Sequence, residues 1–422
     1  MNRVLTPVIA PLWVILSVTS GMTSDYVSIS GYYKNFFSVY DPPRIGIDGN
    51  SVDSPEIGDA LNRLRLNLSR KFGTRIDMNI SYSLAPRVNF NSFSYADLRI
   101  TELNQSDYRI DDIDYILYPE NPRPGNTFII NQNLDRLYCG IRGDNFDLYI
   151  GRQAIAWGSA RVVNPTDILA PYRFEELDTE ERIGVDAIRA RIPMGALSEL
   201  DLGVVSGKDF NFKSSAAFLR GKFYTLKADV SAMIIAFREN LMTGLDIATS
   251  VGGAGVWLES AYTFPDALND DSNIEKDDSY LTVSLGSDYS FGDKTYGFIE
   301  YYFNQAGAGD PNEYRSQFTK TAYTEGSVYL LGKHYLISGI NYQITPLMNY
   351  SGQLLTNLND PSVFFYSLLE YNFASNIYLS GGAFIGVGKK PEVNYGFPVS
   401  EDLNSEFGTY PDIYFTSISI YF

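Results

Sequence analysis

Hydrophobic and polar residues alternate in many segments of the chain, most clearly in the last thirteen residues. One face of an extended strand there carries Tyr414, Thr416, Ile418, Ile420 and Phe422, and the other face carries Phe415, Ser417, Ser419 and Tyr421. Alternation over about ten residues suits a strand that has lipid on one side and a polar lumen on the other. An edge strand of a soluble sheet alternates in the same way, so this segment alone leaves both interpretations open.

The same pattern recurs along the chain and predicts eighteen strands. They are expected at 26–40, 61–71, 75–84, 134–142, 146–155, 183–192, 197–205, 214–223, 225–237, 243–251, 255–264, 280–291, 295–304, 335–344, 348–357, 363–373, 377–387 and 410–422. Bacterial membrane barrels have an even number of strands. Sixteen strands are the alternative, in which the segments between 223 and 251 do not form a pair.

The connections between these strands alternate in length. Short turns follow every second strand, at 72–73, 143–145, 193–195, 252–253, 292–293, 345–346 and 374–375. Most of the others are long, at 41–60, 85–133, 156–182, 265–279, 305–334 and 388–409. A soluble sandwich has no reason to sort its loops in this way. The predicted fold is therefore all-β, a transmembrane antiparallel up-and-down β-barrel of 16–18 strands, eighteen preferred, with short periplasmic turns and long extracellular loops.

Composition and charge agree with a membrane barrel. A chain of 422 residues suits one large barrel, and its 32 Tyr and 26 Phe suit aromatic girdles at the two membrane interfaces. The net charge of −17 argues against a nucleic-acid partner, which would need a basic surface. Cys139 is the only cysteine, which excludes an internal disulfide, a CxxCH haem site and a cysteine-based zinc site.

The first 22 residues resemble a secretory signal. Arg3 precedes an apolar run over 4–18, and the small residues Thr19, Ser20 and Gly21 follow it. Cleavage is expected between Ser20 and Ser24, with an uncleaved membrane anchor as the alternative. The predicted organisation is a signal peptide at 1–22 and a single barrel domain at 23–422.

Charged residues within the strands predict two oppositely charged walls in the lumen. A charge on the lipid face costs about 2–4 kcal/mol near the midplane, so the face opposite the aliphatic side chains points inward. The early strands then carry a basic wall of Lys34, Arg63, Arg65, Arg75, Arg136 and Arg142, and the late strands an acidic wall of Glu259, Asp288, Glu300 and Glu370. Opposed walls would orient dipolar solutes in an open pore. Alternatively, the charges pair across the lumen and plug it.

Two strands depart from this rule. Simple alternation in 146–155 and 183–192 would place Arg152, Arg189 and Arg191 on the lipid face. We expect β-bulges near Gly151 and Ala187 to return these side chains to the lumen. Both bulges would flank the loop 156–182 and would set the direction in which it leaves the barrel wall.

Several short motifs lie around that loop and near the C-terminus. They are Gly151-Arg152-Gln153-Ala-Ile-Ala-Trp157-Gly158, Asn164-Pro165-Thr-Asp167, the later Arg173, Glu175 and Glu176, Thr345-Pro346-Leu347 and Asn357-Leu358-x-Asp360. In these motifs, and in layout over most of its length, the chain resembles porin-like outer-membrane proteins of Gram-negative bacteria, including uncharacterised types near the alginate-export channels. The terminal Phe422 also resembles the assembly signal of such barrels, although Ser417 stands where many of those strands have Gly.

The resemblance implies that the loop 156–182 folds into the lumen as a constriction, with Arg152, Arg161, Asp167 and Arg173 near the narrowest point. From the residues alone, 164–167 is a turn and Trp157 a girdle aromatic, so a plain surface loop is the alternative. Outer-membrane lipid and lipopolysaccharide are the expected surroundings. The barrel assembly machinery is the expected partner of the strand that ends at Phe422.

Two further patterns carry little chemistry. The acidic segment 271–277 is spaced like a calcium loop, but Lys276 replaces the required Gly and Thr282 the bidentate Glu. A solvated loop is expected there, with a weak divalent site shared with lipopolysaccharide as the alternative. His334 is the only histidine, and no acid or serine close in sequence completes a catalytic set. We expect no enzyme activity, no cofactor and no resident metal.

These features predict a channel for passive passage of small hydrophilic solutes, integral to the outer membrane. A barrel that sheathes or docks a partner, such as polysaccharide-export machinery or a redox protein, is one alternative. A surface receptor or adhesin that uses the long acidic loops is another.

Overall fold

The computed structural model describes residues 27–53, 55–90, 108–110, 115–120, 126–172, 174, 176–269, 276–325, 328–394 and 400–422. The expected signal peptide at 1–22, Arg173 and Glu175 lie outside these residues, as does most of the acidic segment 271–277.

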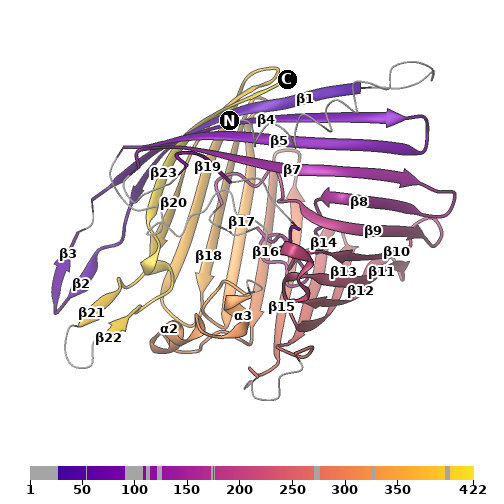
Figure 1. Cartoon of the computed structure of the whole chain (residues 1–422). Helices are drawn as coiled ribbons and strands as arrows, with labels where there is room; N and C mark the ends of the chain where they lie inside the picture. Colours follow the sequence, from indigo (N-terminus) through magenta and orange to yellow (C-terminus); the bar gives the residue numbers. More distant parts are fainter. Residues whose placement is uncertain are drawn as a thin grey trace.

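Eighteen antiparallel strands form one closed barrel, as the alternation predicted (Figure 1). They are, in order around the barrel, β1 (Val27–Asp41), β4 (Ile57–Phe72), β5 (Ile76–Asn89), β7 (Phe128–Arg142), β8 (Asp147–Gln153), β9 (Val185–Pro193), β10 (Glu199–Val205), β11 (Ala216–Thr225), β12 (Ala228–Phe237), β13 (Asn240–Val251), β14 (Ala254–Phe264), β15 (Tyr280–Phe291), β16 (Thr295–Asn304), β17 (His334–Thr345), β18 (Met348–Asn357), β19 (Ser362–Ala374), β20 (Ile377–Val387) and β23 (Asp412–Tyr421). The segments between 223 and 251 do form strands, which settles the choice between sixteen and eighteen.

The last strand closes the barrel against the first. β23 pairs with β1 from Tyr421 opposite Tyr32 to Asp412 opposite Asp41. The backbone of Phe422 extends this ladder, because its carbonyl accepts from Gly31 N–H at 2.8 Å and its N–H donates to the Gly31 carbonyl at 3.0 Å. The alternation of the C-terminal segment is confirmed, since Tyr414 is exposed on the outer face and Phe415 is buried.

An aliphatic belt covers the outer face of the barrel. Exposed members from strands all around it are Leu66, Ile188, Leu219, Leu285, Ile340 and Leu369. Such a surface is stable against lipid, so the barrel is of the membrane-spanning kind. No helix among the described residues is long and apolar enough to cross a membrane.

The long connections gather at one end of the barrel, at the bottom of Figure 1, and the C-terminus lies at the other end. Two of them form a small sheet of β2 (Ile45–Ile47), β3 (Asn50–Val52), β21 (Glu392–Asn394) and β22 (Ser400–Asp402), in the order β22-β21-β2-β3. Two other connections carry the short helices α2 (Tyr314–Gln317) and α3 (Thr321–Thr324) and the strand β6 (Ile116–Tyr118), which pairs with β7. This sorting of short and long connections is the predicted one.

The predicted bulges at Gly151 and Ala187 are wrong. β8 pairs with β7 and with β9 in unbroken register through both residues. The irregularity lies instead on β7, where Ser81 of β5 is opposite Arg136 and Tyr82 opposite Leu134, so that Asp135 is the extra residue. Val185 and Ala187 are buried on the inner face, so Arg189 and Arg191 share that face by simple alternation.

Candidate functional site

The connection between β8 and β9, residues 154–184, crosses the lumen and contacts both charged walls. Its first half bonds to inward side chains of β14 and β16, and its second half bonds to inward side chains of β1, β4 and β7. We refer to these residues as the lumen loop. The loop therefore spans the barrel between two walls of opposite charge.

Glu259 of β14 holds the first half by its backbone. One carboxylate oxygen accepts hydrogen bonds from the N–H of Ser159 (3.0 Å) and Ala160 (3.1 Å). The other accepts from the Thr166 N–H (2.8 Å) and hydroxyl (2.7 Å). Since Glu259 is fully buried, these bonds compensate its lost hydration.

Glu300 of β16 continues the same arrangement. Its carboxylate accepts from the N–H of Arg161 at 2.7 Å and of Val163 at 3.1 Å. Gly158 permits the close approach of the loop to Glu259, because at φ +110° a Cβ would lie 2.3 Å from the Asn164 side-chain oxygen and 2.7 Å from Glu259. The acidic wall thus binds the loop through backbone groups.

Arg161 places its side chain at the same wall. Its Nε donates to Asp288 Oδ2 at 2.9 Å and lies 3.1 Å from the Tyr296 hydroxyl. The guanidinium also lies 4.9 Å from the centre of the Trp257 ring. Its side chain remains 43% exposed, so this ion pair faces open space in the lumen.

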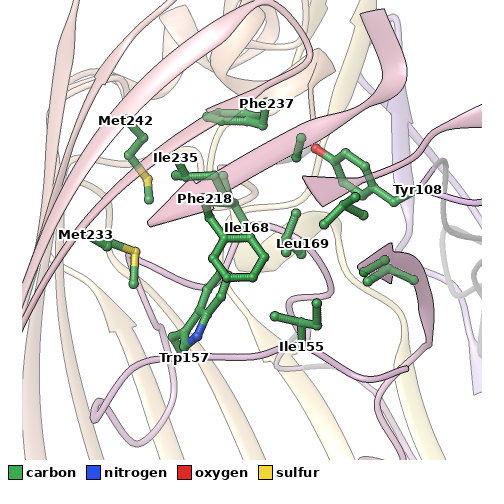
Figure 2. Close-up of a cluster of buried hydrophobic side chains, with 14 of the residues drawn as sticks. Tyr108, Ile155, Trp157, Ile168, Leu169, Phe218, Met233, Ile235, Phe237 and Met242 are labelled. Atoms are coloured by element: carbon green, nitrogen blue, oxygen red, sulfur yellow. The ribbon is translucent and has the colours of Figure 1, made fainter. Parts of the chain in front are cut away.

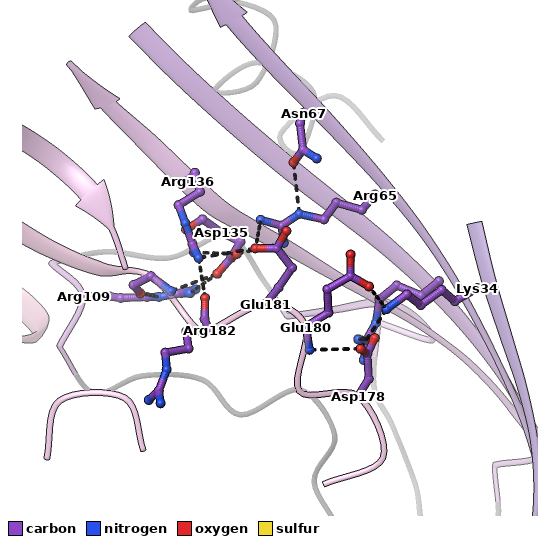
Figure 3. A network of polar contacts seen from close by, with 12 residues as sticks. Lys34, Arg65, Asn67, Arg109, Asp135, Arg136, Asp178, Glu180, Glu181 and Arg182 are labelled. Carbon is purple, nitrogen blue, oxygen red and sulfur yellow. Dashed lines mark hydrogen bonds and ion pairs between the residues drawn. The ribbon is translucent and has the colours of Figure 1, made fainter. Parts of the chain in front are cut away.

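The second half of the lumen loop binds the basic wall (Figure 3). Asp178 accepts from Lys34 Nζ at 2.8 Å and from Arg63 Nη1 at 2.6 Å. Burial alone would raise the pKa of Asp178, but Arg63 and Lys34 hold it below its ordinary value. Glu180 adds a second carboxylate to Lys34. The carboxylates of the loop therefore neutralise these two cations.

Asp135, the extra residue on β7, organises the neighbouring network. Arg65 and Arg136 approach its Oδ2 at 2.8 Å and 2.6 Å. Its Oδ1 accepts from the Gly184 N–H of the loop at 2.9 Å. Arg136 also donates to the carbonyl of Arg182 at 2.6 Å. The bulge thus places a buried carboxylate where it joins two wall arginines to the end of the loop.

An apolar core fills the lumen beside β9–β14 (Figure 2). Trp157 of the loop packs on Phe218 of β11 with ring centres 4.8 Å apart, and its Nε1 donates to Asp201 Oδ2 at 3.3 Å. Ile155, Ile168 and Leu169 complete the loop's share of this core. Trp157 is therefore an anchor inside the barrel and not a girdle aromatic.

A polar cavity of about 420 Å³ remains between the lumen loop and the inner faces of β15–β20. We refer to it as the chamber. Its lining includes Arg161, Asp167 and Arg182 from the loop, and Gln353 and Tyr366 from the opposite wall. A smaller space of about 50 Å³ lies between the loop and the basic wall.

Asp167 and Arg182 form an ion pair within the loop at the edge of the chamber. Burial raises the pKa of Asp167 to about 7, and Glu259 adds to the rise, while Arg182 opposes it. Arg182 also donates to the carbonyl of Ala170 at 2.8 Å. This pair ties the two halves of the loop together.

The structure separates the expected constriction residues. Arg161 and Asp167 line the chamber. Arg152 does not, because it shares the outer face of β8 with exposed Ile150 and pairs with Asp186 at 2.9 Å. Both members of that pair line a groove of about 1000 Å³ together with the exposed, outward residues Ile188 and Val204.

The residues of the two expected walls lie at different levels of the barrel, and only some of them contact the lumen loop. Arg63, Arg65 and Arg136 are engaged by the loop or by Asp135. Arg75 pairs with Asp144 in the exposed turns, and Arg142 lies 3.7 Å from Asp77 at the same end of the barrel. Glu259, Asp288 and Glu300 hold the loop, and Glu370 lies on the same face of β19 as Tyr366, which lines the chamber.

Sequence reasoning missed the acidic residues that neutralise the basic wall. These are Asp178, Glu180 and Glu181 of the loop and Asp135 of β7. The first three form the run Asp-Thr-Glu-Glu at 178–181, inside the loop that was already expected to enter the lumen. Because their charge is opposite to that of the basic wall, this run could have predicted that the loop pairs with the wall.

Comparisons with known proteins establish the fold. No family model matches the chain, and no curated protein matches it in sequence. OccAB4 of Acinetobacter baumannii is 10% identical, with a TM-score of 0.55 over 95% of this chain and 99% of that one. A BenF-like porin of Pseudomonas fluorescens Pf-5 is 10% identical, with a TM-score of 0.55 over 94% and 98%. OpdK of Pseudomonas aeruginosa, solved with vanillate, is 10% identical, with a TM-score of 0.53 over 94% and 98%. The predicted porin-like barrel is thus confirmed at the level of fold.

Proposed function

We propose that the protein is a porin-like channel through which small hydrophilic solutes pass passively across the outer membrane. The observation that carries this proposal is the chamber, a polar space inside the barrel that the chain itself leaves open. A barrel of 16–18 strands is wide enough for an aqueous passage, which a folded-in loop can narrow. The proposal includes no covalent step, no catalysis and no cofactor.

In this proposal the lumen loop sets the selectivity. Among the described residues, Arg161, Asp167, Glu176 and Arg182 are the loop's charged groups at the chamber, and Asp288 supplies the wall's charge beside Arg161. Charged groups around a narrow aqueous path select solutes by charge and by size. Because Glu259 and Glu300 bind backbone groups, they fix the position of the loop without taking part in this selection.

The filling of the lumen argues against a barrel that sheathes a partner. The apolar core and the lumen loop occupy the space that a threaded polypeptide would need. We also propose that the signal peptide at 1–22 is removed, and that the strand ending at Phe422 is the segment recognised by the barrel assembly machinery. Lipopolysaccharide is the proposed neighbour of the outer half of the aliphatic belt.

Single-channel recording in planar bilayers tests the channel. The comparison is wild type, Arg161→Ala, and the matched control Arg75→Ala, whose pair with Asp144 is exposed in the turns. We expect stable conductance in all three and a stronger cation preference in Arg161→Ala, because Asp288 loses its counter-charge. Folded wild-type protein that leaves the bilayer closed would overturn the channel function.

A further inference from the structure

We propose that the chamber selects neutral solutes with a sugar-like ring over anions of the same size, an inference that rests on the proposed channel function. A pore loop with arginines would ordinarily favour anions. Here, however, the arginines of the chamber are already bound to carboxylates of the protein.

Both arginines that line the chamber among the described residues are compensated. Arg161 donates to Asp288 at 2.9 Å, and Arg182 forms its ion pair with Asp167. Glu176 also lines the chamber and adds another negative charge. An incoming carboxylate would have to displace a protein carboxylate and would remain beside it, which is electrostatically unfavourable in a narrow site.

Aromatic rings form much of the wall opposite the loop. Tyr366 and Phe384, on adjacent strands β19 and β20, have ring centres 5.0 Å apart, and Tyr302 and Tyr329 line the same chamber. Ring faces bind flat apolar surfaces. The C–H face of a sugar ring is such a surface, whereas an open-chain polyol has none.

Side-chain amides supply the polar half of the site. Gln353 from β18 and Asn164 from the loop line the chamber. Within the part of the chain that the structure describes, no hydrogen bond joins either side-chain amide to another residue. An amide both donates and accepts hydrogen bonds, as a hydroxyl group does, so these amides match the hydroxyl groups of a sugar.

The size of the chamber agrees with a small ring solute. Small-molecule sites usually enclose roughly 300–1,000 Å³, and the chamber encloses about 420 Å³. Aromatic faces, uncommitted amides and compensated charges together match a neutral hydroxylated ring better than they match an anion.

Liposome swelling with three solutes tests the inference. Purified full-length protein is reconstituted, and swelling is followed in isosmotic glucose, glucuronate and sorbitol. Glucuronate keeps the glucose ring and carries a carboxylate in place of the hydroxymethyl group, whereas sorbitol keeps the hydroxyls and lacks the ring. We expect glucose to permeate roughly three- to tenfold faster than either, the ratio that ring contacts of this strength produce.

Two variants of one strand tie the preference to the chamber. Tyr366→Ala, on the inner face of β19, should bring the glucose-to-sorbitol ratio close to one, and Tyr371→Ala, on its exposed outer face, should leave the ratio unchanged. If Tyr366→Ala does not assemble, Gln353→Leu replaces it and should slow glucose severalfold.

The outcomes separate the two proposals. Channels that conduct KCl but pass glucuronate or sorbitol as fast as glucose would overturn the sugar preference alone, as would a glucose-to-sorbitol ratio that Tyr366→Ala leaves intact or a glucose rate that Gln353→Leu leaves unchanged. Protein that conducts neither ions nor solutes would overturn the channel function and this inference with it. Faster glucose that depends on Tyr366 or Gln353 would support both.

Discussion

Arg63 of β4 and Asp178 of the lumen loop form an ion pair in which Nη1 and Oδ2 are 2.6 Å apart, although 115 positions separate them in the chain. The two side chains are only 6% and 8% exposed. Lys34 binds the other oxygen of the same carboxylate at 2.8 Å. A displaced loop would take this carboxylate away from two buried cations, which is costly, so the carboxylate fixes the second half of the loop to the early strands.

Replacing Asp178 with Asn should therefore loosen the loop. Breaking a buried ion pair costs about 3–5 kcal/mol, and we expect that cost to appear as local detachment while the barrel stays closed. Open-channel current should become larger and noisier, and added protease should cut within 172–182. Asp53→Asn, whose pair with Arg44 is more than 70% exposed, is the control. Wild-type current and protease resistance in Asp178→Asn would contradict this assignment.

The first half of the loop should respond to Glu259→Gln. The amide keeps one acceptor oxygen where the carboxylate offers two to Ser159, Ala160 and Thr166. Hydrogen bonds to a charged group contribute about 1.5–3 kcal/mol each, so amide hydrogen exchange over 159–166 should become at least tenfold faster. Glu370→Gln, an inward carboxylate on β19, is the control. Unchanged exchange in Glu259→Gln would mean that other contacts hold the loop.

The barrel itself could be predicted closely from the sequence. β15, β16, β18 and β20 begin and end at the residues that the alternation indicated. Each of these strands has a tight turn at one end and one lipid face, so a shift of one residue would expose its inward polar residues to lipid. Local pattern therefore specifies them almost completely.

The direction of β9 could not be predicted in the same way. The rule that aliphatic residues face lipid fails where the lumen is filled by the chain's own loop, because the inner face is then apolar as well. Val185 and Ala187 pack against Trp157 and its neighbours inside the barrel. The partners of that core lie up to about 100 positions away in the chain, and alternation within one strand carries no information about them.

Selectivity should depend on pH through Asp167. Its pKa of about 7 in the folded protein lies above the ordinary value of 3.8. Between about pH 4 and 7 the folded protein keeps a proton that the unfolded chain has released, so this group's contribution to the free energy of unfolding falls as pH rises through that window and is constant above it. Below pH 7 the neutral Asp167 leaves the charge of Arg182 uncompensated.

Reversal potentials measured between pH 5 and 8 test this effect. We expect the ion preference to move toward anions as the pH falls through about 7. Asp167→Asn should show the low-pH preference at every pH. Burial also raises the pKa of Glu406, in the loop before β23, to about 7. A pH response that persists in Asp167→Asn would therefore assign the effect to Glu406 or to another group.

Replacing Arg152 and replacing Arg161 with glutamine should affect different properties of the channel. Arg152 lies on the outer face, whereas Arg161 lies at the chamber. Arg152→Gln breaks the pair with Asp186, in which both side chains are largely buried. We expect it to lower thermal stability, by about 1–3 kcal/mol in the free energy of unfolding, and to leave the ion preference as in wild type.

Arg161→Gln removes a half-exposed charge at the chamber. It should shift the ion preference toward cations and change stability by less than about 1 kcal/mol. Thermal unfolding in detergent and reversal potentials on the same preparations measure both effects. If Arg152→Gln changed the preference and Arg161→Gln did not, the ion path would run along β8 and not through the chamber.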